Sequence, residues 1–581
     1  MKDLPAWPQA GCSKSCCEDA GSVMDVGLAD DESASIVIIG GGPHALAALS
    51  ALHDGAPAAG SGSICVIDPG SHFMESWNSR FDALEIKHLR SPTLAHPAPF
   101  DPTALLDFAT EQGRTNELIE APQAALHGHG YGPPVWLPST DLGAKGALLK
   151  ALPSSALFRD FCASLEAKLP HKWLSGSAVS VCKDEATGKL RVHYTPKTCS
   201  SSDGSSSSQR ERRVAARAVI LATGPVGKWS IPAPFAPYVQ DGSRLVLHTE
   251  AMLSSSQGGK PTGERGSLSE EITRRCPGES ARVLILGGGI SAAQAALAAY
   301  RAGHHVVLRS RKPLTTKAFD VGSEWLDVRT ADRLRFEFLC LPYKQRRQCV
   351  REATPGGSVP ANYMDELLRL SSSTSSSTPS LRLEMDEAIE SSEVCVDEVN
   401  EMVTVNGETY AMIILATGTI AVPSGSHLYQ SIEQRFHQAQ TVEGLPKVDH
   451  NLRWVPNEDL FVLGANAMLE LGPGGGNLMG AMRGARVVAH ELHGLMGKTG
   501  EARPSFGNMY ASLGDRQRFK NCVGHEAEID VLATQLNLSP QAETALRKAR
   551  KSGNKASRRL KQGERDPMKS LTSDLRRAAY A

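Results

Sequence analysis

Two glycine-rich segments of this chain have the residue types and spacing that can hold a diphosphate. Both follow the pattern Gly-x-Gly-x-x-Ala, the first over residues 40–45 and the second over residues 287–292. A turn without side chains lets the backbone approach a diphosphate closely, and the N–H groups that begin the next helix bind its negative charge. The residues predicted to form these sites are Gly40, Gly42, Pro43 and Ala45 in the first segment and Gly287, Gly289 and Ser291 in the second.

The sequence around each segment indicates the elements that must position it. Apolar runs at residues 35–39 and 282–286 come directly before the glycines, and alanine-rich runs come directly after them. These patterns predict a buried parallel strand, a tight turn and a helix. One such match is weak evidence, because a strand-to-helix turn without a ligand has the same pattern. Nucleotide binding is favoured by the repetition and by the residues that come after each helix.

An acid ends the next predicted strand after the first glycine segment. The run at residues 63–68 closes with Asp68, where a carboxylate can accept hydrogen bonds from the ribose hydroxyls of FAD or NAD. The separation between the first glycine segment and this acid is longer than the usual ~20 residues. The small-residue stretch 55–62 is typical of a loop insertion, which would explain the extra length.

Two arginines take the place of that acid after the second glycine segment. Arg309 and Arg311 end the predicted strand that begins at residue 305. Guanidinium groups donate bidentate hydrogen bonds to phosphates, so this end favours the 2′-phosphate of NADP. A pair of solvated arginines after an edge strand is the alternative. Together the two halves predict FAD in the first site and NADPH in the second.

Two further apolar strands end in the tripeptide Ala-Thr-Gly. The first carries Thr223 and Gly224, and the second carries Thr417 and Gly418. Small residues at such turns let the chain pass close to a cofactor and cross between domains. An ordinary core strand is the alternative for either turn alone, and the recurrence of the tripeptide makes it the weaker interpretation.

Composition indicates a large soluble enzyme. A chain of 581 residues exceeds what one hydrophobic core usually supports, so two or more domains are expected. The net charge of −1 argues against a nucleic-acid binder. No stretch of about 20 apolar residues predicts a membrane span, and the N-terminus lacks a secretory signal. The twelve cysteines are scattered, as in a reducing compartment, so a cytoplasmic location is expected.

The ends and several loops are expected to be accessory. Residues 1–33 are predicted to be disordered, although Cys12, Cys16 and Cys17 cluster there. Residues 496–581 form a basic extension that could bind an unknown partner, with a solvated, partly helical tail as the preferred interpretation. Two serine-rich stretches predict surface loops. His127 and His129 lie among glycines and predict a loop, so no metal site is expected.

At this point the residues resemble a known group of enzymes, the N-hydroxylating flavoprotein monooxygenases that act on ornithine and lysine. The likeness rests on the order of an acid, a Trp with a polar residue, and a Leu-Arg-x-Pro turn, here Asp68, Trp77 with Asn78, and residues 89–92. A closer likeness is to uncharacterised flavoproteins with Arg-Phe-Asp-x-Leu and His-Leu-Arg-Ser-Pro segments, here residues 80–84 and 88–92.

The resemblance continues near residue 470 and covers about residues 34–495. The segment with Gly464, Gly472, Asn477 and Leu478 is similar to the last flavin-domain strand and to the helix whose N-terminus faces the flavin. The resemblance implies an α/β fold with two Rossmann-like dinucleotide-binding domains. An FAD domain is expected over residues 34–235 and 440–495, and an NADP domain over residues 280–420 is inserted into it.

The resemblance also implies the reaction. NADPH reduces FAD, the reduced flavin takes up dioxygen as a C4a-hydroperoxide, and the side-chain amine of a small amino acid is hydroxylated. Glu85 stands where the group has a Gln beside the flavin, and an acid there would disfavour the anionic reduced ring unless it is protonated or turned away. Arg90 stands where the group has a Lys for the substrate carboxylate, and Asn362 is a candidate for the substrate amine by position.

Two alternatives remain open. One is a flavin monooxygenase for another small nucleophile, such as a sulfide, ketone or purine. The other is a regulatory protein that binds flavin without turnover. A disulfide reductase is disfavoured, because residues 69–110 contain no cysteine for a redox pair.

Overall fold

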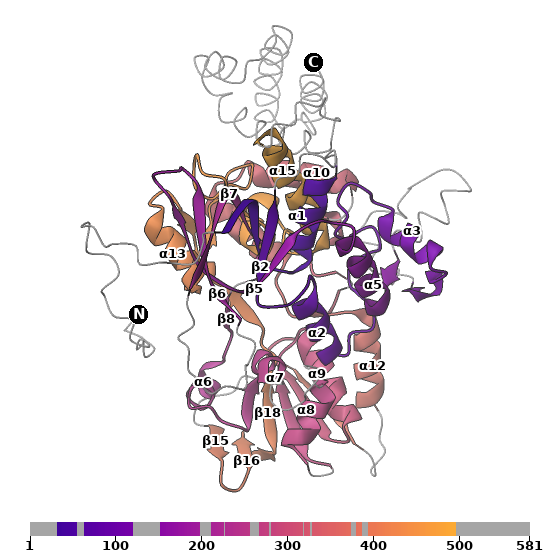
Figure 1. The fold of residues 1–581 in the computed structure, drawn as a ribbon. Helices are drawn as coiled ribbons and strands as arrows, with labels where there is room; N and C mark the ends of the chain where they lie inside the picture. The colour runs from indigo at the N-terminus through magenta and orange to yellow at the C-terminus, as the bar shows by residue number, and fades with distance from the viewer. Residues whose placement is uncertain are drawn as a thin grey trace, which may run out of the picture.

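The computed structural model describes a mixed helix and strand fold built on two sheets. It describes residues 32–54, 63–119, 151–197, 211–225, 227–255, 267–277, 280–317, 319–325, 328–372, 379–385 and 393–495. Figure 1 shows one sheet in the upper half of the molecule and the other in the lower half. The N-terminal cysteines, the His127 loop, most of the serine-rich stretches and the basic extension lie outside the described residues.

The first sheet has six strands in the order β1-β2-β5-β6-β7-β22, and β1 also pairs with β7. Five of them form a parallel set in the order β5-β2-β1-β7-β22, while β6 is antiparallel to its neighbours β5 and β7. The apolar run of β1 is buried at its C-terminal end, as expected for a central parallel strand. The strands are β1 (Glu32–Ile39), β2 (Ile64–Asp68), β5 (Lys172–Lys183), β6 (Leu190–Pro196), β7 (Arg212–Leu221) and β22 (Leu460–Val462).

The second sheet has five strands in the order β14-β11-β10-β18-β9, and all its pairings are parallel. Its central strand β10 precedes the second glycine segment, just as β1 precedes the first. A three-stranded antiparallel sheet, β15-β16-β17, lies beside it. The strands are β9 (Val246–His248), β10 (Arg282–Leu286), β11 (His305–Ser310), β14 (Leu381–Met385), β15 (Val394–Asp397), β16 (Met402–Val405), β17 (Glu408–Tyr410) and β18 (Met412–Leu415).

A short antiparallel ribbon connects the two halves of the molecule. It pairs β8 (Gly227–Trp229) with β19 (Thr419–Ala421), and each strand directly follows one of the two Ala-Thr-Gly turns. The chain therefore crosses between the halves at these turns. The other short strands are β3 (Leu118–Ile119), β4 (Leu152–Pro153), β12 (Thr315–Thr316), β13 (Ser358–Val359), β20 (Thr441–Val442) and β21 (Leu445–Pro446).

Helices cover both sheets, and the two that come after the glycine segments are largely buried. In α1 (Pro43–His53) all residues but the last are buried, and α1 packs along α15 (Leu478–Leu495). In α9 (Ile290–Arg301) a run of alanines allows close packing on the second sheet. The remaining α-helices are α2 (Glu75–Ala83), α3 (Ala104–Glu111), α5 (Ser155–Glu166), α6 (Ala236–Gln240), α7 (Thr249–Ser255), α8 (Leu268–Arg275), α10 (Val328–Leu339), α11 (Tyr343–Ala353), α12 (Ala361–Ser371), α13 (His427–Arg435) and α14 (Met468–Leu471).

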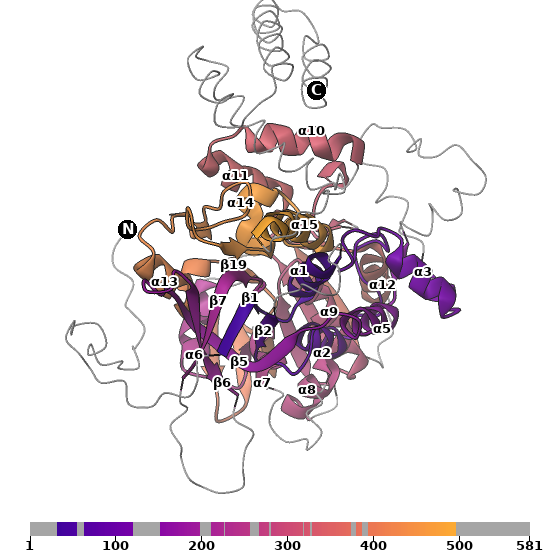
Figure 2. The ribbon, with the colours of Figure 1, turned by 45° about the horizontal axis from the view of Figure 1, so that its top comes forward.

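Helices α10 and α11 leave the second sheet and pack on the first half. In sequence they fall between β11 and β14, yet Figure 2 shows them above α14 and α15. A small apolar core that includes Trp325 and Phe338 fixes them, with Met468 of α14 packed against it. Helices α10 and α11, which in sequence belong to the second half, therefore cover the loop before α15 in the first half.

The expected mixture of helices and strands is confirmed, and the two strand–glycine–helix units are consistent with two dinucleotide-binding domains. Two boundaries differ from the expectation. Strand β1 already begins at Glu32, inside the stretch 1–33 that was expected to be disordered. Strand β9 at Val246–His248 precedes residue 280 but belongs to the second sheet. It joins this sheet because it pairs with β18, and strand pairing does not follow sequence order.

Candidate functional site

The first glycine turn has the geometry that a bound diphosphate requires. Gly40 has a φ of +116°, and a Cβ there would meet the Ala222 carbonyl oxygen at 2.4 Å. Gly40 therefore serves the close packing of β1 against the chain after β7. A Cβ on Gly42, in contrast, would meet nothing within 4 Å, so open space lies at the N-cap of α1. An 11-residue helix begins there with its N–H groups directed at that space.

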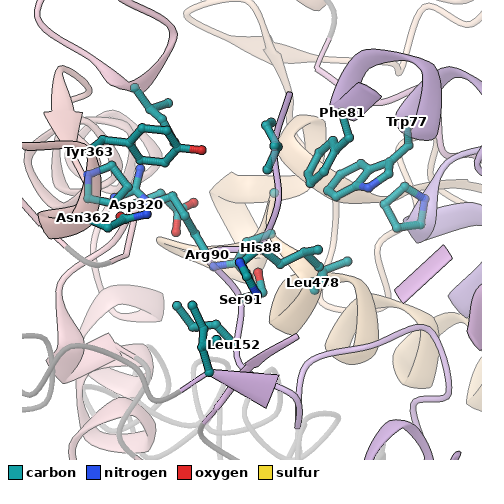
Figure 3. A pocket seen from close by; sticks show the side chains of 18 of the residues that line it. Trp77, Phe81, His88, Arg90, Ser91, Leu152, Asp320, Asn362, Tyr363 and Leu478 are labelled. Carbon is teal, nitrogen blue, oxygen red and sulfur yellow. The ribbon is translucent and has the colours of Figure 1, made fainter. Parts of the chain in front are cut away.

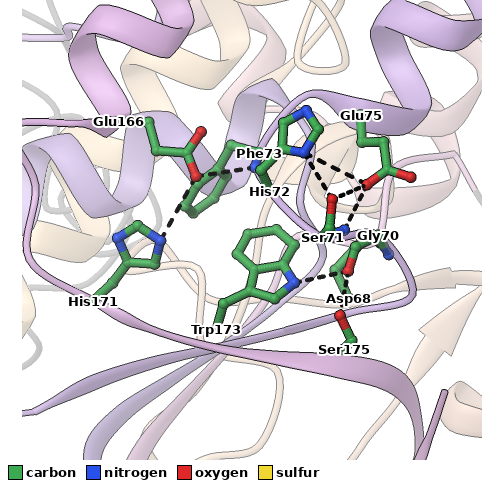
Figure 4. A network of polar contacts seen from close by, with 10 residues as sticks. All are labelled: Asp68, Gly70, Ser71, His72, Phe73, Glu75, Glu166, His171, Trp173 and Ser175. Atoms are coloured by element: carbon green, nitrogen blue, oxygen red, sulfur yellow. Dashed lines mark hydrogen bonds and ion pairs between the residues drawn. The ribbon is translucent and has the colours of Figure 1, made fainter. Parts of the chain in front are cut away.

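Asp68 lies beside this turn in a network of polar contacts at the end of β2. Its Oδ1 accepts a hydrogen bond from the Gly70 N–H at 2.8 Å, and the Gly70 carbonyl accepts from Trp173 Nε1 and Ser175 Oγ, each at 2.8 Å (Figure 4). Burial raises the pKa of Asp68, and the N–H groups of Gly70 and Gly41 partly offset this. The loop around the carboxylate is thus fixed from the next strand, which places Asp68 next to the glycine turn.

Both Ala-Thr-Gly turns contain glycines in the left-handed region and threonines held by hydrogen bonds. Gly224 and Gly418 have φ values of +73° and +76°. Thr223 Oγ1 lies 3.1 Å from the Tyr429 hydroxyl, and Thr417 donates to the Ser230 carbonyl. These contacts fix the points where the chain passes from the sheets to the connecting ribbon.

Asn466 holds the first of these turns in place by hydrogen bonds. It was not among the residues predicted from the sequence. Its Nδ2 donates to the Gly224 carbonyl at 3.0 Å and to the Tyr429 hydroxyl at 2.8 Å, and its side chain is fully buried. Burial raises the pKa of Tyr429 to about 12, so this hydroxyl stays protonated. A signal was present in the sequence, because Asn466 comes after a strand and Gly464, a place where polar side chains often serve a site.

The second glycine turn repeats the packing of the first. Gly287 has a φ of +151°, and a Cβ there would meet the Ala416 carbonyl oxygen at 2.3 Å. At Gly289 a Cβ would lie 3.5 Å from the Cα of Gly357, a contact without overlap. Ser291 lies in the first turn of α9, and Ile290 beside it lines a cavity between the two halves.

The two arginines expected at the NADP phosphate have different surroundings. Arg309 is 4% exposed, and its Nε donates to Glu384 Oε2 at 2.6 Å across the pairing of β11 with β14. Arg311 is exposed just beyond the strand. The buried ion pair with Glu384 therefore disfavours a phosphate role for Arg309, and Arg311 remains the candidate.

The cavity between the two halves has a volume of about 410 Å³ (Figure 3). The residues expected in a site that line it are Pro43, Trp77, Arg90, Asn362, Asn477 and Leu478. From the second half it receives Ile290, Asp320, Pro360, Asn362 and Tyr363. The sequence did not show that these two sets meet. Asn78 is on α2 beside Trp77 but does not line the cavity.

The first half supplies the aromatic end of the cavity. Trp77 and Phe81 stack with their ring centroids 4.6 Å apart, because they are four residues apart on α2 and share one face of it. Asn477 lies at the other edge, at the N-terminus of α15, where its Oδ1 accepts from the Gly480 N–H at 3.0 Å. The preceding loop bends at Gly472, whose φ is +79°. A helix N-terminus and an aromatic wall thus face the same space.

His44 lines this end of the cavity, and Gly464 lies behind its ring. A Cβ on Gly464 would lie 3.5 Å from the His44 ring, and His44 Nε2 lies 3.2 Å from the Gly476 carbonyl oxygen. Burial lowers the pKa of His44 to about 4. The imidazole is therefore neutral at pH 7, and Nε2 carries the hydrogen that the carbonyl accepts.

The opposite end of the cavity is polar. Arg90 Nη2 donates to the Lys317 carbonyl at 2.9 Å and lies 3.4 Å from Ser358 Oγ. Burial lowers the pKa of Arg90, and Asp320 opposes the effect. His88 also lines the cavity, and burial lowers its pKa, so it is neutral at pH 7. Figure 3 shows Asp320 close to Asn362 and Tyr363, on the side away from Trp77.

Glu85 is turned away from the cavity, contrary to the flavin-side position that we expected. Its Oε1 accepts from Ser269 Oγ at 2.6 Å, and its Oε2 accepts from Arg301 Nη1 at 2.7 Å. Glu85 adopts a left-handed φ of +54°, which directs its side chain toward α8 and α9. The carboxylate connects the two halves, and its charge is balanced by Arg301.

The described residues contain no group of three His, Cys, Asp or Glu side chains that could hold a metal ion. Among the helices in the described ranges, none is long and apolar enough to cross a membrane. The open space at Gly42 with Asp68 beside it fits the diphosphate and ribose of a dinucleotide.

The chain has the fold of the N-hydroxylating flavoprotein monooxygenases, so the resemblance expected from the sequence is confirmed at the level of the fold. The ornithine N-hydroxylase of Kutzneria sp. 744 is 17% identical, with a TM-score of 0.55 over 80% of this chain and 99% of that chain. The cadaverine monooxygenase of Erwinia amylovora is 16% identical, with a TM-score of 0.54 over 80% of this chain and 95% of that chain.

A third similar structure is the L-lysine 6-monooxygenase of Pseudomonas syringae, which is 15% identical, with a TM-score of 0.52 over 79% of this chain and 99% of that chain. No protein-family model and no curated protein sequence matches this chain.

Proposed function

We propose that this chain is an FAD- and NADPH-dependent monooxygenase that hydroxylates the side-chain amine of a small amine or amino acid. The observation that carries the proposal is the cavity between the two glycine turns, which has Pro43 of α1 on one side and Ile290 of α9 on the other. A site that draws on both turns is what hydride transfer between two nucleotides requires. The solved structures with this fold, named for ornithine, cadaverine and lysine, support an amine as the substrate.

The first half fits FAD. The N-terminus of α1 would hold the diphosphate at Gly42, and Asp68 would accept from the ribose. Trp77 and the N-terminus of α15 would enclose the flavin end, where helix N–H groups stabilise negative charge on a reduced ring. In the second half, Gly289 would lie at the NADPH diphosphate and Arg311 near the 2′-phosphate.

Bound FAD would supply the redox chemistry, with hydride from NADPH and oxygen from O₂. The protein's own residues bind and orient the substrate and exclude water. The amine must be uncharged to act as a nucleophile, and the neutral imidazole of His88, which lines the cavity, can accept a hydrogen bond from it. The carboxylate of Glu85 pairs with Arg301 outside the cavity lining, so it does not lie where it would oppose flavin reduction.

The proposal is tested by mixing the FAD-loaded protein with NADPH without oxygen, then admitting air in the presence of a panel of amines. We expect NADPH to bleach the flavin, air to restore it, and a product heavier by one oxygen atom to appear with at least one amine. A flavin that NADPH cannot reduce would favour a non-catalytic flavin protein. Rapid reduction with only hydrogen peroxide formed from every amine would point to another nucleophile, such as a sulfide.

A further inference from the structure

The polar end of the cavity contains two charged side chains with different surroundings. The guanidinium of Arg90 is engaged with the backbone, since its Nη2 donates to the Lys317 carbonyl at 2.9 Å. Asp320 lines the same cavity and is exposed to it. Asp320 interacts with the charge of Arg90, whose pKa it raises, but within the described part of the chain it accepts no hydrogen bond, so its carboxylate oxygens can accept hydrogen bonds from an occupant of the cavity.

Described residues near Asp320 on both sides make contacts with other parts of the chain. Before it, the Lys317 N–H donates to the Val359 carbonyl at 3.0 Å, while the Lys317 carbonyl accepts from Arg90. After it, Val321 is 2% exposed and belongs to the apolar core of α10 and α11. These contacts limit the backbone movement near Asp320, which lowers the entropic cost when its carboxylate binds a cation.

The cavity has opposite characters at its two ends. Figure 3 shows Asp320, Asn362 and Tyr363 together on one side and the stacked rings of Trp77 and Phe81 on the other. Under the proposed function, the reacting amine lies toward the aromatic end, where the flavin would bind. The far end of the substrate then lies toward Asp320, whose carboxylate disfavours a second negative charge close to it.

We propose that Asp320 determines specificity by binding a positively charged group at the end of the substrate opposite to the reacting amine. The favoured substrates are then small diamines and similar dications, in preference to molecules with a carboxylate at that end. This inference rests on the proposed function and names the substrate class of the same site. It replaces the expectation that Arg90 holds a substrate carboxylate, because Arg90 is engaged in fastening the second half to the first.

The test compares amines of equal chain length that differ at the far end. Cadaverine has an ammonium there, pentylamine a methyl group and 5-aminopentanoate a carboxylate. We expect kcat/KM for hydroxylamine formation to be about 10- to 100-fold higher for cadaverine than for pentylamine, the range of one charge-assisted hydrogen bond. The value for 5-aminopentanoate should be the lowest.

Two variants assign the effect to one side chain. Asp320→Asn should remove the preference for cadaverine over pentylamine and leave the Kd of NADPH unchanged within about twofold. Asp365→Asn is the matched control, because Asp365 is an exposed acid on α12 outside the cavity lining. It should leave all three amines unchanged.

The outcomes separate this inference from the proposed function. Hydroxylation of all three amines at equal rates, or best of 5-aminopentanoate, would overturn the role of Asp320 while the monooxygenase stands. A loss of NADPH affinity in Asp320→Asn with the amine preference intact would place the carboxylate at the nucleotide instead. Should no amine be hydroxylated, the proposed function fails, and calorimetric titration of the FAD-loaded protein with cadaverine and 5-aminopentanoate still decides whether Asp320 binds cations.

Discussion

At the scale of single residues, the glycines of the first turn have different tasks that the motif alone does not distinguish. Gly40 lies against the chain that comes after β7 and has a left-handed φ, whereas Gly42 has an extended backbone and faces open space. The first glycine therefore serves the fold. The second serves whatever occupies the space at the N-cap of α1.

We expect Gly42→Ala to lower FAD affinity by about tenfold, or 1.4 kcal/mol, without a change in the melting temperature of the apoprotein. The Cβ is tolerated by the protein and intrudes only on the ligand. Gly40→Ala is the matched control and should lower the melting temperature of the apoprotein, because its Cβ meets the Ala222 carbonyl. Fluorescence titration with FAD and thermal denaturation measure both. Normal FAD affinity in Gly42→Ala would remove the diphosphate from this turn.

Arg309 within β11 and Arg311 just after it also have different tasks. Arg311→Ala should lower kcat/KM for NADPH by about 10- to 100-fold and leave NADH use nearly unchanged, because one charge-assisted contact to the 2′-phosphate is lost. Arg309→Ala should lower stability by about 3 kcal/mol, the lower end for a broken buried pair, since Glu384 keeps Arg382 as a partner. Flavin reduction with both nucleotides measures the first effect. Equal losses for NADPH and NADH in Arg311→Ala would contradict the assignment.

At the scale of elements, α11 holds the loop that begins α15. Arg346 of α11 is 1% exposed, and its Nη1 donates to Glu470 Oε2 at 2.7 Å and to the Leu469 carbonyl at 3.0 Å. Its guanidinium also lies 4.6 Å from the ring centroid of Tyr343. Through α14, this side chain fixes the approach to Gly472 and therefore the N-terminus of α15.

Arg346→Met should destabilise the protein by about 3 kcal/mol, the lower end for a broken buried pair, and lower its FAD content, because Glu470, whose pKa burial raises to about 7, would lose its partner and take up a proton. The double variant Arg346→Met with Glu470→Leu should recover much of that stability, since both charges are then gone. Thermal denaturation and the flavin-to-protein absorbance ratio measure these effects. If the double variant were no more stable than the single one, the backbone contacts of Arg346 and not the ion pair would hold the helices together.

At the scale of the whole molecule, separate contacts tie the two halves together around the cavity. Arg80 pairs with Glu250, Arg301 with Glu85, and Arg90 reaches the Lys317 carbonyl. The first two pairs are partly exposed, so each contributes little stability alone. Together they fix the position of one glycine turn relative to the other. The cavity shared by both halves depends on that position.

Stability of the whole protein should fall in mild acid because of buried neutral histidines. Burial lowers the pKa of His96 to about 4, and its Nδ1 accepts from the Ala98 N–H. The unfolded chain binds this proton near pH 6.5 and the folded chain does not, so stability is lost as the pH falls from about 6.5 to about 4. His96→Asn keeps an acceptor two residues before the same N–H but cannot titrate.

Between pH 7 and 4.5 the variant should therefore lose about 2 kcal/mol less unfolding free energy than the parent protein. Urea unfolding at a series of pH values measures the difference. His437→Gln, at an exposed position, is the control and should follow the parent protein. Parallel curves for the parent and His96→Asn would mean that His96 is protonated in the folded state.

The sequence by itself determined the local units of this protein. Glycine spacing after apolar runs identified β1 with α1 and β10 with α9, and Asp68 was located at the end of β2, because these features depend on neighbours in the chain. Tertiary structure alone decided which distant residues meet. Asp320 lines the cavity together with Arg90 of the first half, and Glu85 turns away because Arg301 lies within reach. Charge balance and packing between segments that lie far apart in the chain leave no periodic pattern in a sequence.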